Sequence, residues 1–178
     1  MEDRRKEIHF KRVAGPEASR RRRENQVVQI RKGKREERLV KIRSLVPGTL
    51  VSSTLSPGDI PELVIALLAS LELETTLSSV RQLRQLLSFE EDPPVDQVVD
   101  APGLLPRLIE LLRCDASTEL QVEVAWALTN VASTDRAGEL VEAGACPELV
   151  RLLGQEHAVE VREQAAWCLG NIAGDQPE

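Results

Sequence analysis

The chain repeats part of its own sequence after 41 residues, and this period limits the folds that it can adopt. The segment Ala125–Asn130 reads AWALTN, and the segment Ala166–Asn171 reads AWCLGN. The period extends to a glycine and a proline that precede each segment, Gly103 and Pro106 in the first copy and Gly144 and Pro147 in the second. A fixed period in the forties, filled with helical apolar spacing, is typical of stacked helical repeats.

Each copy holds one of the two tryptophans of the chain, followed four residues later by an asparagine. Four residues make about one helical turn, so Trp126 and Asn130 share one helix face, as do Trp167 and Asn171. Stacking of the repeats would align these faces, so that flat rings alternate with amides. Such a surface suits the binding of an extended polypeptide better than catalysis.

The net charge of −6 conceals a strongly polarised chain. Residues 1–43 hold 16 Lys and Arg against 7 Asp and Glu, a net charge of +9. Residues 44–178 hold 7 Arg, no Lys and 22 Asp and Glu, a net charge of −15. A basic arm on an acidic body predicts self-association or two partners of opposite charge.

Several classes of protein are excluded by what the sequence lacks. Three cysteines without metal-type spacing indicate a reducing compartment, and His9 and His157 have no ligand partners at metal spacing. The longest apolar run, Leu63–Leu71, is too short to span a bilayer, and the basic N-terminus precedes no signal-peptide core. No phosphate loop or catalytic constellation is present. We therefore expect a soluble intracellular protein that is not an enzyme and uses no cofactor, no metal and no small-molecule substrate.

The pattern of apolar residues and helix breakers predicts three regions: a basic arm over 1–43, a linker over 44–57 and a helical body over 58–178. The arm has too few apolar residues for a core, so we expect it to be mostly unfolded alone and helical when bound. Ser56-Pro57-Gly58-Asp59 predicts a helix start, and the helix to about residue 71 should be buried. Further helices are predicted at 72–88, 95–100, 104–113, 117–133, 137–143, 146–153 and 158–173, with no strand.

Two helices of the body carry the expected core stripes. These stripes are Leu120, Val124, Leu128 and Val131 in the first helix and Val161, Ala165, Leu169 and Ile172 in the second. The Trp and Asn residues, with Glu123 and Gln164, fall on a neighbouring face, where a concave groove would run.

These features together resemble importin alpha, the nuclear-import adaptor family. The arm, from Arg20-Arg21-Arg22-Arg23 to Arg43, resembles its importin-beta-binding segment, and residues 93–106 resemble the end of its first armadillo repeat. The segments 125–133 and 164–175 resemble its second and third repeats. The resemblance implies an all-α, right-handed armadillo solenoid of about three repeats, preceded by a basic, partly disordered arm.

The resemblance also implies roles for individual residues. The groove would bind a nuclear localisation signal of a cargo protein: asparagines hold the cargo backbone, tryptophan rings form slots for Lys and Arg, and an acid receives a cargo lysine. The implied groove residues are Trp126, Asn130, Ser133, Gln164, Trp167, Asn171 and Asp175. The implied importin-beta-binding residues are Arg20, Arg21, Arg22, Arg23, Arg31, Lys32, Lys34, Arg35, Arg38, Lys41 and Arg43. The implied location is both cytoplasm and nucleus, between which such adaptors shuttle.

The chain also departs from this family pattern. The family has roughly ten repeats, whereas this sequence ends just after the third, so we expect its last helix to expose an apolar face and to favour self-association. Two residues are missing between Asn130 and Gly144, and Lys41-Ile42-Arg43 replaces a run of basic residues that mimics cargo, which predicts weak autoinhibition by the arm. The alternative is an armadillo scaffold whose arm binds nucleic acid or an acidic surface. The acidic body and the single aromatic of the arm, Phe10, argue against nucleic acid.

Overall fold

The computed structural model describes residues 55–89 and 92–174, which belong to one compact unit that spans residues 47–178. Every regular element in these two ranges is a helix, as predicted. The elements are η1 (Pro57–Asp59), α2 (Ile60–Ala69), α3 (Leu73–Leu86), α4 (Val95–Val99), α5 (Leu104–Leu111), α6 (Thr118–Ala132), α7 (Ala137–Glu142), α8 (Ala145–Arg151) and α9 (Val159–Gly174). The basic arm, and the predicted linker up to residue 54, lie outside the described residues, whereas Pro57 at the end of that linker begins η1.

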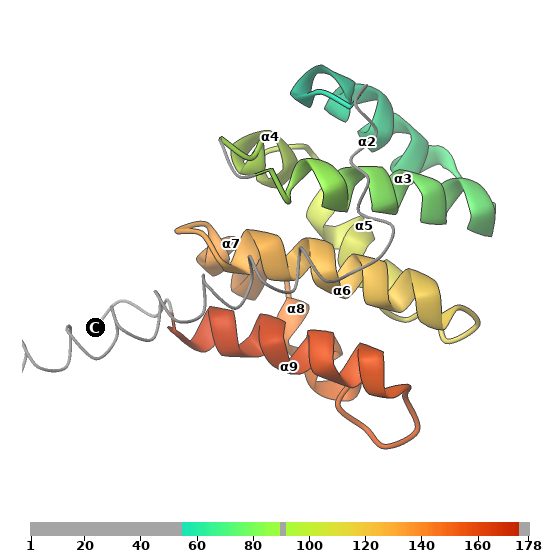
Figure 1. The fold of residues 1–178 in the computed structure, drawn as a ribbon, viewed down its shortest axis with the longest axis vertical. Helices are drawn as coiled ribbons and strands as arrows, with labels where there is room; N and C mark the ends of the chain where they lie inside the picture. Colours follow the sequence, from blue (N-terminus) through green and yellow to red (C-terminus); the bar gives the residue numbers. More distant parts are fainter. Residues whose placement is uncertain (1–54, 90–91, 175–178) are drawn as a thin grey trace, which may run out of the picture. The chain divides into compact units, whose positions relative to one another are not determined.

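The helices form two layers (Figure 1). In one layer α3, α6 and α9 lie side by side, with α6 packed against both neighbours. In the other layer α2 packs on α3, α5 on α6 and α8 on α9. The short helices α4 and α7 precede α5 and α8, so the order short helix, outer helix, inner helix occurs twice after the α2–α3 pair. This arrangement confirms the predicted helical-repeat architecture.

Two glycines explain why the 41-residue period includes the turns between helices. Gly103 and Gly144 directly precede α5 and α8, with φ of 80° and 84°. Glycine adopts this left-handed conformation without the steric penalty that a Cβ imposes. The same backbone turn therefore directs the chain from a short helix into an outer helix in both repeats.

The core of the second repeat is formed by the residues that the sequence predicts. Leu120, Val124, Leu128 and Val131 of α6 are all fully buried, because α6 has neighbours on both sides. In α9 the stripe differs by one position. Cys168 is fully buried, whereas Leu169, which we expected in the core, is only partly buried.

The first described α-helix is less buried than predicted. Ile60, Leu63 and Leu67 of α2 face the core, but Ile65 is 66% exposed and Leu71, just after the helix, is 95% exposed. The main helix neighbours of α2 among the described residues are α3 and α5, which leave these two side chains exposed. Its start is as predicted: the Ser56 N–H donates to the Asp59 carboxylate at 2.8 Å, within the 3₁₀ turn η1.

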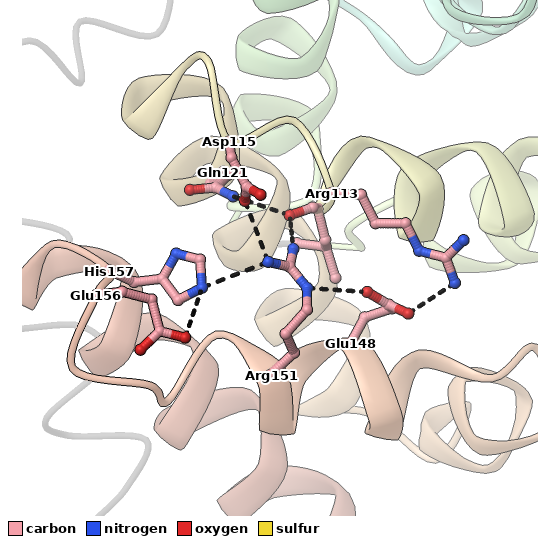
Figure 2. Close-up of polar contacts among 8 residues, drawn as sticks. Arg113, Asp115, Gln121, Glu148, Arg151, Glu156 and His157 are labelled. Atoms are coloured by element: carbon pink, nitrogen blue, oxygen red, sulfur yellow. Dashed lines mark hydrogen bonds and ion pairs between the residues drawn. The ribbon is translucent and has the colours of Figure 1, made fainter.

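Arginines of the outer layer join successive repeats. Arg107 of α5 donates from Nε to the Leu67 carbonyl oxygen and from Nη2 to the Ser70 carbonyl oxygen, both at 3.1 Å. Arg151 of α8 donates from Nη2 to the Leu112 carbonyl oxygen at 2.8 Å and from Nη1 to Asp115 at 3.1 Å (Figure 2). Each guanidinium thus satisfies carbonyl groups at the C-terminal end of the preceding outer helix, which have no partner within their own helix.

Within the described ranges, no helix is long and apolar enough to cross a membrane.

Candidate functional site

The inner layer of α3, α6 and α9 holds the residues that the sequence indicates as a peptide-binding groove. Trp126 and Asn130 lie on α6, and Trp167 and Asn171 lie on α9, one repeat later. These side chains are more buried than expected for a face beside the core stripe. Asn130 is 2% exposed, Asn171 is 1% exposed and Trp126 is 7% exposed, whereas Trp167 is half-buried.

The burial of the asparagines follows from their position between inner helices. Asn130 Nδ2 donates to Ser88 Oγ, two residues after the end of α3, at 3.0 Å, and Asn171 Nδ2 donates to the Thr129 carbonyl oxygen on α6 at 3.1 Å. Each asparagine therefore links its helix to the inner helix of the preceding repeat. Sequence reasoning missed this structural role because it assigned the whole amide to a ligand.

The amide oxygens of the same face have a different environment. Asn130 Oδ1, Asn171 Oδ1 and Gln164 Oε1 are buried and have no hydrogen-bond partner among the described residues. A buried acceptor without a donor is energetically unfavourable, by about 1–3 kcal/mol for a neutral group. Three such oxygens on two neighbouring inner helices could accept hydrogen bonds from the N–H groups of an extended peptide.

One face of the Trp126 ring is already covered by a residue that sequence reasoning missed. Arg84 of α3 places its Cζ 4.4 Å from the ring centroid and forms an ion pair with Glu123 of α6. Glu123 also faces Arg81 Nε at 3.6 Å, and Arg81 pairs in turn with Glu119. Between α3 and α6 the charges of two arginines and two glutamates therefore cancel.

A sequence signal for Arg84 exists. Arg84 and Ser88 are four residues apart and lie 42 residues before Trp126 and Asn130, so they occupy the corresponding positions of the first repeat. We call the pairs Arg84/Ser88, Trp126/Asn130 and Trp167/Asn171 the first, second and third rungs. The signal is easy to overlook because the first rung shares no residue type with the other two.

The remaining predicted residues divide into two sets. Ser133, which follows the last turn of α6, is exposed, and its hydroxyl donates to the Asn130 carbonyl oxygen at 2.7 Å. Asp175 and all the predicted importin-beta-binding residues of the arm lie outside the described residues. Their assignments stay predictions.

Comparison with family models divides the chain in two. The model described as importin beta binding domain matches residues 4–86. The model described as armadillo/beta-catenin-like repeat matches residues 91–133 and 134–174, which correspond to the second and third repeats described above.

Curated relatives match the same region. Importin subunit alpha-4 of Arabidopsis thaliana is 41% identical over 159 residues, a match that covers 79% of this chain and 29% of the relative. Importin subunit alpha of Saccharomyces cerevisiae is 38% identical over 130 residues, covering 64% of this chain and 24% of the relative. The chain thus spans less than a third of the length of these relatives.

Solved armadillo structures have the same fold. A designed armadillo repeat protein, solved in complex with the peptide (KR)4, matches with a TM-score of 0.59 and 30% sequence identity. The match covers 78% of this chain and 57% of the designed protein. A second designed armadillo repeat protein matches with a TM-score of 0.56 and 32% identity, covering 64% of this chain and 46% of that protein.

Proposed function

Because the chain belongs to the importin alpha family, whose N-terminal part it matches, we propose that it is a nuclear-import adaptor. The inner layer of α3, α6 and α9 binds Lys/Arg-rich localisation signals of cargo proteins, and the basic arm, residues 1–43, binds importin beta. The proposal assigns no catalytic activity to the chain. Such an adaptor shuttles between cytoplasm and nucleus.

The observation that carries the groove assignment is the set of unpaired amide oxygens on α6 and α9. Asn130 Oδ1, Gln164 Oε1 and Asn171 Oδ1 are buried and have no partner among the described residues. Hydrogen bonds to the backbone of a peptide do not depend on its side chains. A groove built in this way accepts many cargo sequences.

Two features favour basic cargo, the Trp167 ring and the negative charge of the body. Trp167 is half-buried, so part of its indole surface is available to a Lys or Arg side chain, which a ring attracts by about 0.5–2 kcal/mol. The net charge of −15 over residues 44–178 attracts cations to the body at long range. The designed armadillo protein that binds (KR)4 supports the same use of this fold. Asp175 would add a carboxylate for a cargo lysine.

The groove is tested by titration calorimetry of the full chain with a Lys/Arg-rich signal peptide. Trp167→Ala should weaken binding about two- to thirtyfold, because it removes a ring face that a cation covers. Val150→Ala, a control on the exposed surface of α8, should bind as the parent does. Equal affinity of the Trp167 variant and the parent, with both folded by circular dichroism, would exclude this groove as the cargo site.

The arm is tested separately. A peptide of residues 17–43 should gain helical circular dichroism when importin beta is added, because an acidic superhelical partner can pair with its clustered cations. Replacing Arg20, Arg21, Arg22 and Arg23 by glutamate should abolish the gain. Failure of the unmodified peptide to bind at physiological salt would remove importin beta from the proposal.

A further inference from the structure

The first rung differs in chemistry from the two that follow it. In place of a tryptophan and an asparagine, the first repeat has Arg84 on α3 and Ser88 just after this helix. The bond from Asn130 Nδ2 to Ser88 Oγ shows that the first and second rungs are in register. A peptide that follows the inner layer past Trp126 therefore meets a guanidinium at the place where the pattern would supply another ring.

Arg84 is held firmly at this place. Arg84 is 5% exposed, and its Cζ lies 4.4 Å from the centroid of the Trp126 ring. Its Nε donates a hydrogen bond to the Glu123 carboxylate. A cation already stacked on the ring fills the position that a cargo Lys or Arg would take on that face.

One donor of this buried guanidinium is unused. Arg84 Nη1 is buried and has no hydrogen-bond partner among the described residues, although its neighbour Glu123 accepts from Nε. Hydrogen bonds from a charged donor to a carboxylate are among the strongest in proteins. A hydrogen bond from Arg84 Nη1 to an acceptor on a bound ligand would therefore be stronger than a hydrogen bond from a neutral donor.

We propose that Arg84 determines specificity at the first rung: it excludes a basic residue from that side of Trp126 and selects an acidic residue of the cargo peptide. The inference rests on the proposed function, because it presupposes a peptide in the groove. The basic cluster of the cargo binds at the second and third rungs, and the acidic residue follows it on the α3 side. Glu123 holds Arg84 in place and does not contact the peptide.

The spacing between the two parts of such a signal follows from helix and strand geometry. Packed helices are about 8–10 Å apart, and an extended peptide advances about 3.3 Å per residue. The acidic residue should therefore lie about three residues beyond the cation that contacts Trp126. A set of peptides with one basic cluster and Glu, Gln or Lys placed three residues beyond either end tests both peptide directions.

Calorimetry of the full chain with this peptide set is the experiment. When the variable residue lies beyond one of the two ends of the basic cluster, the parent chain should bind the Glu peptide about tenfold more tightly than the Lys peptide. The affinity for the Gln peptide should be intermediate. The double variant Arg84→Met, Glu123→Gln should lose this order, because it removes the guanidinium without leaving the Glu123 charge unpaired. Arg81→Gln is the matched control. Arg81 also pairs with Glu123, and with Glu119, but Arg84 and not Arg81 covers the Trp126 ring, so the order should be kept.

A second variant keeps the test decisive if the double variant does not fold. Arg84→Lys retains the positive charge but lacks the Nη1 donor, so it should still reject the Lys peptide while its preference for Glu over Gln falls. A parent chain that binds all three peptides equally, a double variant that keeps the parent's order, or an Arg84→Lys variant that prefers Glu over Gln as strongly as the parent does would overturn the inference and leave the groove assignment intact. If no basic peptide binds the parent, the proposed function fails and this inference fails with it.

Discussion

Cys168 lies in the core of α9 with its thiol fully buried, and this burial raises its pKa to about 12. A thiol with an ordinary pKa of about 8.5 is already a few per cent thiolate at neutral pH, which is the form that reacts with alkylating agents. Cys114 and Cys146 are only partly buried.

We therefore predict that iodoacetamide at pH 7.5 modifies Cys114 and Cys146 first, and modifies Cys168 only when the protein unfolds. Mass spectrometry of the labelled peptides, with and without urea, measures the order. Labelling of Cys168 in the native protein at the rate of Cys114 would contradict the packing of α9.

Single residues are also where sequence reasoning was least accurate. It located both Trp–Asn pairs from their spacing, but not the burial of Asn130 and Asn171, because a helical pattern does not show how close the neighbouring inner helix comes. It placed Leu169 in the core stripe of α9, where the structure has Cys168, for the same reason. Arg84 could be found only by aligning unlike residue types at the same repeat position.

At the level of elements, the turns before the outer helices require glycine. Gly144→Ala should destabilise the chain by about 1 kcal/mol or more, because its φ of 84° is unfavourable for a residue with a Cβ. Gly138→Ala is a matched control: Gly138 lies within α7, and a Cβ there would meet nothing within 4 Å. That change should be neutral or stabilising. Urea unfolding of the two variants compares them directly, and equal effects would contradict the left-handed turn.

The outer-layer ion pairs predict a dependence of stability on pH. The hydrogen bond from Arg151 lowers the pKa of Asp115, and the hydrogen bond from Arg113, with a further one from Arg151, lowers the pKa of Glu148 (Figure 2). A lowered pKa in the folded state means that the unfolded state binds protons first, so this stabilisation is present above about pH 4 and is lost as the pH falls through the folded-state values.

Arg151→Met should accordingly reduce stability at pH 7 and have much less effect at pH 2.5. Denaturant unfolding at the two pH values measures this difference. A variant as destabilised in acid as at neutral pH would show that Arg151 acts through its bond to the Leu112 carbonyl oxygen and through packing, not through the two carboxylates.

The helices themselves were largely predictable, because apolar spacing, Ser56, Ser117 and the prolines mark their limits. The exposure of Ile65 and Leu71 was not, because an apolar run shows that a helix can be buried but not whether a neighbour covers both of its faces.

In the molecule as a whole, a comparison of α6 and α9 shows that a following repeat buries one face of an inner helix. Ala125 and Ala132 are buried on α6, whereas Ala166 and Ala173, 41 positions later, are exposed on α9. Ala125→Glu should therefore cost about 3 kcal/mol or more, because it buries a carboxylate without a partner. Ala166→Glu should stay within about 0.5 kcal/mol. Thermal unfolding monitored by circular dichroism tests the pair, and similar melting temperatures would contradict the stacking of α9 on α6.

The exposed face of α9 also bears on the expected self-association. If copies of the chain associate through this face, sedimentation velocity should show dimers that increase with concentration, and Ala166→Glu should reduce them by placing charge on the contact. A parent chain that stays monomeric at high concentration would exclude this association.

A nuclear-import adaptor must connect cargo to importin beta within one chain. The most direct measurement is sedimentation velocity of a fluorescent cargo that carries a Lys/Arg-rich signal, mixed with the full chain and importin beta. We predict that the cargo sediments in a complex of all three components, and that removing either the chain or the basic arm releases importin beta from it. A cargo that sediments alone in the three-component mixture, or that binds the chain only when importin beta is absent, would contradict the assignment.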